Sequence, residues 1–149
     1  MVAILNMDSI LIDIDIKRKE EALLNISEVA KGLGICENEE MIYKELLNRE
    51  NECSTSVGLG IAIPHIKSDY INKVTLVIIK PKKEFYWEKD EEVNVIISIL
   101  APKEVDSNLH IKLLSNLSRK LVNNDYKNLL SNSKDKDTIY NLIESALCS

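Results

Sequence analysis

His65 and His110 are the only two histidines of this sequence, and His65 stands in its most unusual segment. That segment, GLGIAIPH at positions 58–65, combines two of the four glycines with a proline directly before the histidine. Glycine lets neighbouring backbone approach closely, and Pro64 holds φ near about −65°. Because a neutral imidazole is a competent nucleophile near pH 7, a rigid bend that presents it favours nucleophilic chemistry at His65. A histidine that only fills a turn fits the same residues.

His110 and Arg49 lie near the ends of predicted helices. His110 is close to the start of a helix, where free N–H groups and the positive end of the dipole attract phosphate and lower the pKa of an imidazole. Arg49 is near the end of a helix, where a cation is favoured without any function, and its planar fork also suits a phosphoryl group. Taken singly, a histidine at such a position is more often an ordinary surface helix residue, and an arginine there needs no function to explain it.

Other kinds of site have little support in the sequence. A catalytic metal usually takes three protein ligands, and neither HxH nor HExxH is present. The chain also lacks the phosphate-binding loop GxxxxGK[ST] and the esterase elbow GxSxG. Cys36, Cys53 and Cys148 are an odd number without a CxxC pair, which predicts reduced thiols. We therefore expect no metal and no bound cofactor.

Hydrophobic periodicity predicts the elements that hold these side chains. Alternating isoleucines indicate a strand over 10–16, and two β-branched runs bounded by prolines indicate central strands. Apolar residues at three- and four-residue steps indicate helices, of which the last would be capped by Asp137 or Thr138. The remaining elements are central strands at 74–79 and 93–100, a shorter strand or edge at 85–87, and helices at 18–33, 37–50, 108–122 and 138–147.

The spacing of these elements predicts the fold class. The two central strands are too close in the sequence for a helical crossover, which excludes a purely parallel sheet. We expect an α/β (α+β) single domain over residues 1–149, with a mixed parallel and antiparallel central sheet and helices on both faces. A length of 149 residues suits one domain with a sizeable core.

Charge and hydropathy limit the classes of partner that we expect for this protein. The formal net charge is −5 and no dense basic run is present, which argues against a nucleic-acid surface. No apolar stretch reaches the roughly 18–20 residues of a membrane span, and the first residues lack the basic region and cleavage site of a signal peptide. These features predict a cytoplasmic protein without direct membrane insertion, whose partners are proteins or small molecules.

Two ordered motifs resemble one protein family. The first is LLNRE at 46–50 followed by STSVGLGIAIPH at 54–65, and the second is ILAP at 99–102 followed by NLHIKLLSNLS at 108–118. Both are similar to the fructose/mannitol-type enzyme IIA domain of the bacterial sugar phosphotransferase system, and the match spans essentially the whole chain. The sequence departs from the usual pattern in having Ser56 in place of glycine, Ile66 in place of a small residue, and the loop 88–93 where relatives often have Asp-Gly.

The resemblance implies a phosphotransferase component that works through a phosphohistidine. His65 would accept a phosphoryl group from the phosphocarrier protein HPr and pass it to enzyme IIB, which serves with IIC as a sugar permease. The resemblance places His110 beside the phosphoryl oxygens or the first imidazole, and Arg49 where it offsets phosphoryl charge, with no metal needed. Ser54, Thr55 and Ser56 either lend hydroxyls to that group or serve the turn.

Two other hypotheses remain open at this point. A regulatory IIA-like protein, such as the nitrogen-related branch or an antiterminator-type sensor, would use phosphorylation of the same His65 to control a protein partner. An interaction module without phosphorylation would instead require His65 to be inert.

Overall fold

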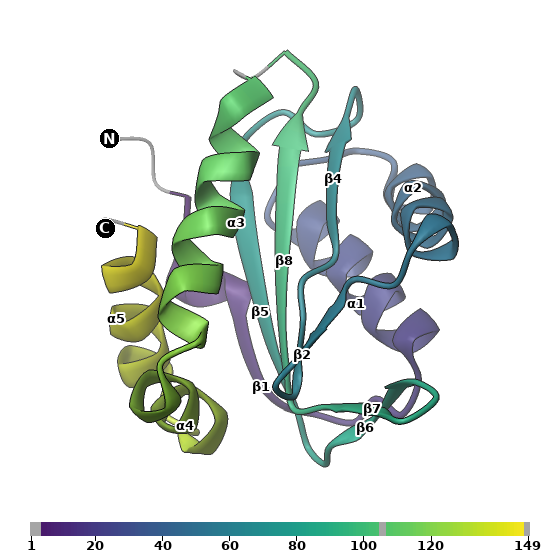
Figure 1. Cartoon of the computed structure of the whole chain (residues 1–149). Helices are drawn as coiled ribbons and strands as arrows, with labels where there is room; N and C mark the ends of the chain where they lie inside the picture. The colour runs from purple at the N-terminus through teal and green to yellow at the C-terminus, as the bar shows by residue number, and fades with distance from the viewer. Residues whose placement is uncertain (1–3, 105–106, 148–149) are drawn as a thin grey trace.

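The computed structural model describes residues 4–104 and 107–147. Fourteen elements follow one another, and Figure 1 shows their arrangement. The helices are η1 (Met7–Ser9, a 3-10 turn), α1 (Lys19–Gly32), α2 (Glu39–Glu52), α3 (Ser107–Leu121), α4 (Asn124–Asn132) and α5 (Lys136–Leu147). The strands are β1 (Ile10–Ile14), β2 (Ser56–Gly58), β3 (Ile61–Ala62), β4 (His65–Ser68), β5 (Thr75–Pro81), β6 (Phe85–Glu88), β7 (Glu91–Val93) and β8 (Val95–Pro102).

The main sheet is mixed, as predicted. Its order is β1-β5-β8-β3-β2, and β4 pairs with β8 further along the same edge as β3. The central pair β5 and β8 is antiparallel, whereas β1 runs parallel to β5 and both β3 and β4 run parallel to β8. Strands β6 and β7 form a separate two-stranded sheet within the connection from β5 to β8. That short connection contains no helix, which is why the central pair is antiparallel.

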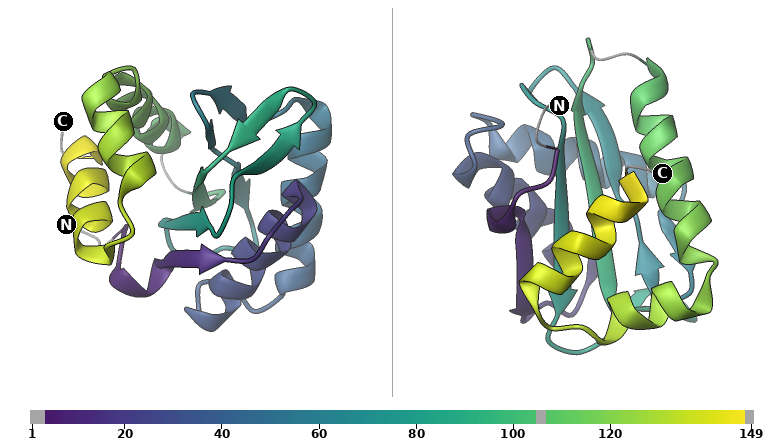
Figure 2. Two further views of the ribbon diagram at one scale, coloured as in Figure 1. Left: turned by 90° about the horizontal axis from the view of Figure 1, so that it is seen from below. Right: turned by 90° about the vertical axis from the view of Figure 1, so that its left-hand side faces the viewer.

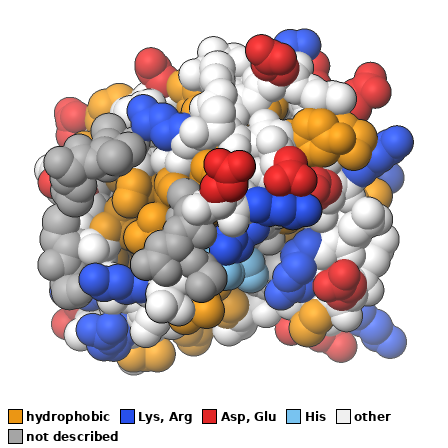
Figure 3. All heavy atoms as spheres, turned by 90° about the horizontal axis from the view of Figure 1, so that it is seen from above, with side chains coloured by type: hydrophobic (Ala, Val, Ile, Leu, Met, Phe, Trp, Pro, Cys, Tyr) orange, Lys and Arg blue, Asp and Glu red, His pale blue; other side chains and the backbone are white. Residues whose placement is uncertain are grey.

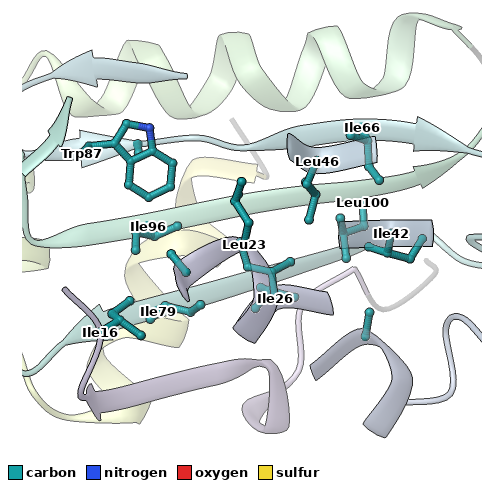
Figure 4. Close-up of a cluster of buried hydrophobic side chains, with 14 of the residues drawn as sticks. Ile16, Leu23, Ile26, Ile42, Leu46, Ile66, Ile79, Trp87, Ile96 and Leu100 are labelled. Atoms are coloured by element: carbon teal, nitrogen blue, oxygen red, sulfur yellow. The ribbon is translucent and has the colours of Figure 1, made fainter. Parts of the chain in front are cut away.

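Helices cover both faces of the sheet, which confirms the predicted layers. Helices α1 and α2 lie on one face, and α3, α4 and α5 lie on the other (Figure 2). Alternate residues of β5 and β8 contribute to two cores because successive side chains of a strand point to opposite faces. Ile79 and Ile96 pack toward α1 and α2, where Figure 4 shows them with Leu23, whereas Ile78 and Ile97 belong to the core under α3 and α5.

Several local predictions are wrong, each for a local reason. The predicted rigid bend at 58–65 lies within residues 56–68, where the structure has the strands β2, β3 and β4, which are too short to show a period. Helix α4 was not predicted, and only Leu130 of its residues is buried. The last helix is capped by Asp135 rather than by Asp137 or Thr138, because its Oδ2 accepts hydrogen bonds from the N–H and the hydroxyl of Thr138 at 3.1 and 2.8 Å.

Two tight turns use left-handed backbone. Gly58, Leu59 and Gly60 have φ of 78°, 62° and 80° and reverse the chain between β2 and β3, so this segment does require special backbone geometry. In the β6–β7 turn, Asp90 has φ 67°. Asp90 thus accepts a conformation that glycine adopts more readily.

Two further features of the structure concern the cysteine thiols and membrane-spanning helices. Cys36 and Cys53 are free thiols, as predicted, and Cys148 lies outside the described residues. Within residues 4–104 and 107–147, no helix combines the length and the apolar character that a bilayer crossing requires.

Candidate functional site

His65 is the first residue of β4 and borders an open depression of about 360 Å³. The strand is held beside β8, where the Ile99 N–H donates to the Pro64 carbonyl at 3.0 Å. The depression is lined from α2, β4 and α3 by Glu45, Asn48, Arg49, Glu52, His65, Ile66, Lys67 and His110. The tertiary structure therefore brings together the three side chains that the sequence singled out. Figure 3 shows histidine in a recess between basic and acidic side chains.

The backbone determines which nitrogen of His65 carries the proton. Nδ1 lies 2.8 Å from the carbonyl oxygen of Ile63, and a carbonyl oxygen can only accept. Nδ1 is therefore the protonated nitrogen, and in the neutral ring Nε2 holds the lone pair. Partial burial lowers the pKa of His65, and the nearby charges of Arg49 and His110 lower it further, against the opposing effect of the Ile63 bond. The neutral, nucleophilic form is thereby favoured near pH 7.

His110 faces His65 from the first turns of α3. The two ring centroids are 6.1 Å apart and the ring planes are inclined by 33°, so the imidazoles are neighbours without being stacked. The Nδ1 of His110 is buried and has no hydrogen-bond partner among the described residues. A buried polar atom without a partner is unfavourable, which makes this nitrogen an unusual feature of the site.

Arg49 serves the end of its own helix and also lines the depression. Its Nη1 donates to the Cys53 carbonyl at 2.9 Å, just after the last residue of α2. The sequence left open a helix-end role and a role toward phosphate, and the position of Arg49 accommodates both. A guanidinium has five N–H donors, so one bond to the helix end leaves capacity for an anion.

The charges around the depression are mixed. Arg49 and Lys67 supply positive charge, while Glu45 and Glu52 lie at the same depression. Glu45 also accepts a hydrogen bond from the buried Ser68 hydroxyl, which ties α2 to β4. No cluster of three or more His, Cys, Asp or Glu side chains suited to a metal occurs in the described part of the chain.

Glu50 is a buried charge whose surroundings the sequence did not reveal. It is only 3% exposed and follows Arg49 directly in α2. Its carboxylate accepts three hydrogen bonds: from the Thr55 N–H at 3.0 Å, the Thr55 hydroxyl at 2.6 Å and the Trp87 indole N–H at 2.6 Å. An acidic residue near a helix end is usually solvated. The only signals in the sequence were the place of Glu50 in the LLNRE motif and the presence of a single tryptophan, Trp87.

The hydroxyls before the glycine turn are used mainly within the loop. The Thr55 hydroxyl donates to Glu50, and the Ser54 hydroxyl accepts from the Ser56 N–H at 3.2 Å. These contacts match the turn interpretation of Ser54 and Thr55. The Ser56 hydroxyl oxygen is buried without a partner within the described residues.

Comparison with known proteins identifies relatives of the whole chain. Residues 3–146 match the family model described as phosphoenolpyruvate-dependent sugar phosphotransferase system, EIIA 2. Multiphosphoryl transfer protein 1 of Escherichia coli is 30% identical over 97% of this chain, which spans only 17% of that protein's length. The fructose-specific EIIA component of Haloferax volcanii is 30% identical, with 84% of this chain and 82% of that protein covered.

Solved structures show the same fold. Nitrogen regulatory protein IIA-Ntr from Neisseria meningitidis superposes with a TM-score of 0.85 at 20% identity, covering 94% of this chain and 96% of the other. The complex of enzyme IIAMTL with phosphorylated enzyme IIBMTL from Escherichia coli contains a chain that superposes with a TM-score of 0.79 at 21% identity, again with 94% and 96% coverage.

Proposed function

The chain belongs to the EIIA 2 family of the phosphoenolpyruvate-dependent sugar phosphotransferase system, and we propose that it is a phosphohistidine carrier whose nucleophile is His65. A role in phosphotransfer follows from the family. The single observation that carries the residue assignment is the bond from His65 Nδ1 to the Ile63 carbonyl, which leaves Nε2 as the lone-pair nitrogen beside Arg49 and His110.

The proposed step is an in-line transfer at Nε2. The Nε2 lone pair forms a bond to phosphorus as the bond from phosphorus to the donor nitrogen breaks, and the electron pair of that bond stays with the donor. Positive charge that develops on the His65 ring is stabilised by the Ile63 carbonyl, which accepts from Nδ1–H. Arg49 offsets charge on the equatorial oxygens and His110 supplies a further hydrogen bond, which is the positioning and electrostatic support that phosphoryl transfer needs.

We propose HPr as the donor and enzyme IIB, with IIC, as the acceptor side of a sugar permease. The likeness to the chain solved with phosphorylated enzyme IIBMTL supports a IIB partner. We propose that residues 1–149 form one domain. With these partners, it would act in the cytoplasm. The likeness to IIA-Ntr supports a second candidate, in which phosphorylation of His65 controls a regulatory protein partner.

The test is incubation with enzyme I, HPr and phosphoenolpyruvate, followed by intact-mass measurement. We expect the wild type to gain one phosphate and His65→Ala to gain none. A wild type without phosphate, or His65→Ala labelled as fully as wild type, would overturn the carrier proposal. Adding candidate IIB proteins then separates the two roles, because a sugar-uptake carrier loses its phosphate to IIB, whereas a regulator retains it until its partner is supplied.

A further inference from the structure

We infer that Glu50 is a positioning residue for the phosphoryl-transfer site, which acts through Thr55 and Ile63 to hold the His65 imidazole with Nδ1 protonated. This inference rests on the proposed function of His65. Glu50 itself does not line the depression, and its carboxylate is enclosed in the protein. Its contribution is therefore geometric and has to be transmitted through neighbouring groups.

The first step is the anchor between α2 and the segment that follows it. Thr55 donates both its N–H and its hydroxyl to the Glu50 carboxylate, and Trp87 adds a third donor from β6. Hydrogen bonds to a charged group are stronger than neutral ones, and a buried carboxylate with three donors is well satisfied. Because Glu50 lies within the last turn of a helix, it holds Thr55 at a fixed position relative to α2.

The second step leads from Thr55 to the imidazole. The Thr55 carbonyl accepts from the Ile63 N–H at 2.9 Å, and the Ile63 carbonyl accepts from His65 Nδ1–H at 2.8 Å. Pro64, between them, has no N–H and a restricted φ, so the Ile63 carbonyl has little freedom to turn. A continuous chain of hydrogen bonds thus runs from the Glu50 carboxylate to the ring nitrogen that selects the tautomer of His65.

Consecutive residues of α2 therefore have separate tasks at one site. Arg49 faces the depression and supplies charge, whereas Glu50 faces inward and fixes the loop that presents the nucleophile. Successive helix positions are about 100° apart around the axis, so neighbours in sequence reach different surroundings. The negative charge of Glu50 also raises the pKa of His65 through space. An experiment must separate this charge effect from positioning.

Glu50→Gln and Glu50→Ala separate the two effects. The Gln amide oxygen can accept from the Thr55 and Trp87 N–H groups, and its NH₂ can donate to the Thr55 hydroxyl oxygen, so the anchor survives without the charge. The Ala variant loses both. Thr55→Val weakens the anchor while leaving the charge of Glu50 in place. It replaces the Ala variant in the test if Glu50→Ala does not fold. Tyr126→Phe is the matched control, since it removes a partly buried side-chain hydrogen bond to the Leu142 carbonyl on the other face of the sheet.

The direct readout is the pair of ¹⁵N imidazole shifts of His65 in the unphosphorylated protein, combined with the rate of phosphoryl acceptance from phospho-HPr. We expect wild type, Glu50→Gln and Tyr126→Phe to keep the Nδ1–H tautomer. Glu50→Ala should move toward Nε2–H, with Thr55→Val shifting less in the same direction. Misplacement of the nucleophile should slow acceptance about 10- to 100-fold in the Ala variant, and Gln should restore most of the rate.

Two results would overturn the inference. One is an unchanged His65 tautomer in a folded Glu50→Ala or Thr55→Val variant. The other is a Gln variant as impaired as the Ala variant, which would assign the effect to charge. A wild type that accepts no phosphate would instead refute the carrier proposal, while the imidazole shifts would still report whether Glu50 positions His65.

Discussion

Replacement of Lys80 by methionine should remove a pH-dependent part of the stability of this fold. Lys80 lies on β5 and is only 5% exposed. Its Nζ donates to the carbonyls of Leu130 and Ser131 at 2.7 and 2.6 Å, at the end of α4. Burial first, and the positive charge of Lys134 second, lower the pKa of Lys80 from 10.5 to about 8. Keeping the Lys80 amine charged in the folded state therefore costs free energy.

The sign and size of the effect follow from proton linkage. Because the folded pKa is below the unfolded one, the unfolded chain binds the proton more tightly between pH 8 and 10.5, and stability rises with pH across that interval. The full difference corresponds to about 3 kcal/mol, of which about 2 kcal/mol is recovered between pH 8 and pH 10. Above pH 10 the opposite trend of Tyr126 begins, since burial raises the pKa of its phenol to about 12.

Urea unfolding at pH 8, 9 and 10, followed by the fluorescence of the single tryptophan, measures this contribution. The free energy of unfolding of wild type should gain about 2 kcal/mol relative to Lys80→Met between pH 8 and pH 10. Lys44→Met, at an exposed position of α2, is the control and should keep the wild-type pH dependence. A difference between wild type and Lys80→Met that stays constant from pH 8 to 10 would refute the reasoning.

Four further outcomes are expected. Arg49→Ala should slow phosphoryl acceptance at least tenfold, which rapid mixing measures. It should lower the free energy of unfolding, measured in urea, by only about 1 kcal/mol, because the bond from Arg49 to the helix end is exposed. His110→Ala should accept phosphate but transfer it more slowly, and unchanged transfer kinetics would remove His110 from the site. Because burial lowers the pKa of His65, the midpoint at which the acceptance rate falls in acid should lie below the ordinary value of about 6.5, and a midpoint above this in a pH–rate profile would contradict the burial argument. Asp90→Gly should be more stable than Asp90→Ala by about 1 kcal/mol in thermal unfolding, since φ is 67° there; equal stability would show that the turn relaxes.

The layers of the fold were predictable because the two central strands are long and buried on both faces. Their β-branched runs identify them in the sequence, and the short link between them excludes a parallel pairing. The same reasoning missed β2, β3 and β4, which have three, two and four residues. Elements of this length are defined by the strand they pair with, here chiefly β8, and not by their own pattern.

The capping residues at helix ends were also not predictable from the sequence pattern alone. Capping depends on where a side-chain oxygen lies relative to a free N–H, and several polar residues in a row offer alternatives. Asp135, Asp137 and Thr138 are all acceptable caps by type, and only the backbone path decides that Asp135 accepts from Thr138. Arg49 could likewise be placed near a helix end from the sequence, but its bond to Cys53 required the structure.

The sequence by itself determined the chemical groups and the backbone that could present them: two histidines, an arginine, and a glycine–proline segment that allows only a few conformations. Only the three-dimensional structure shows that the ring centroids of His110 and His65 are 6.1 Å apart. It also shows that Nδ1 of His65 is hydrogen-bonded to the Ile63 carbonyl, and that the Glu50 carboxylate is enclosed by Thr55 and Trp87. The contacts of His65 with His110 and of Glu50 with Trp87 join residues far apart in the chain, 37 positions in the second case, whereas the bonds to Ile63 and Thr55 are local and depend on the path of the backbone. Periodicity and motif spacing describe neighbours along the chain, whereas tautomer, burial and charge are set by neighbours in space.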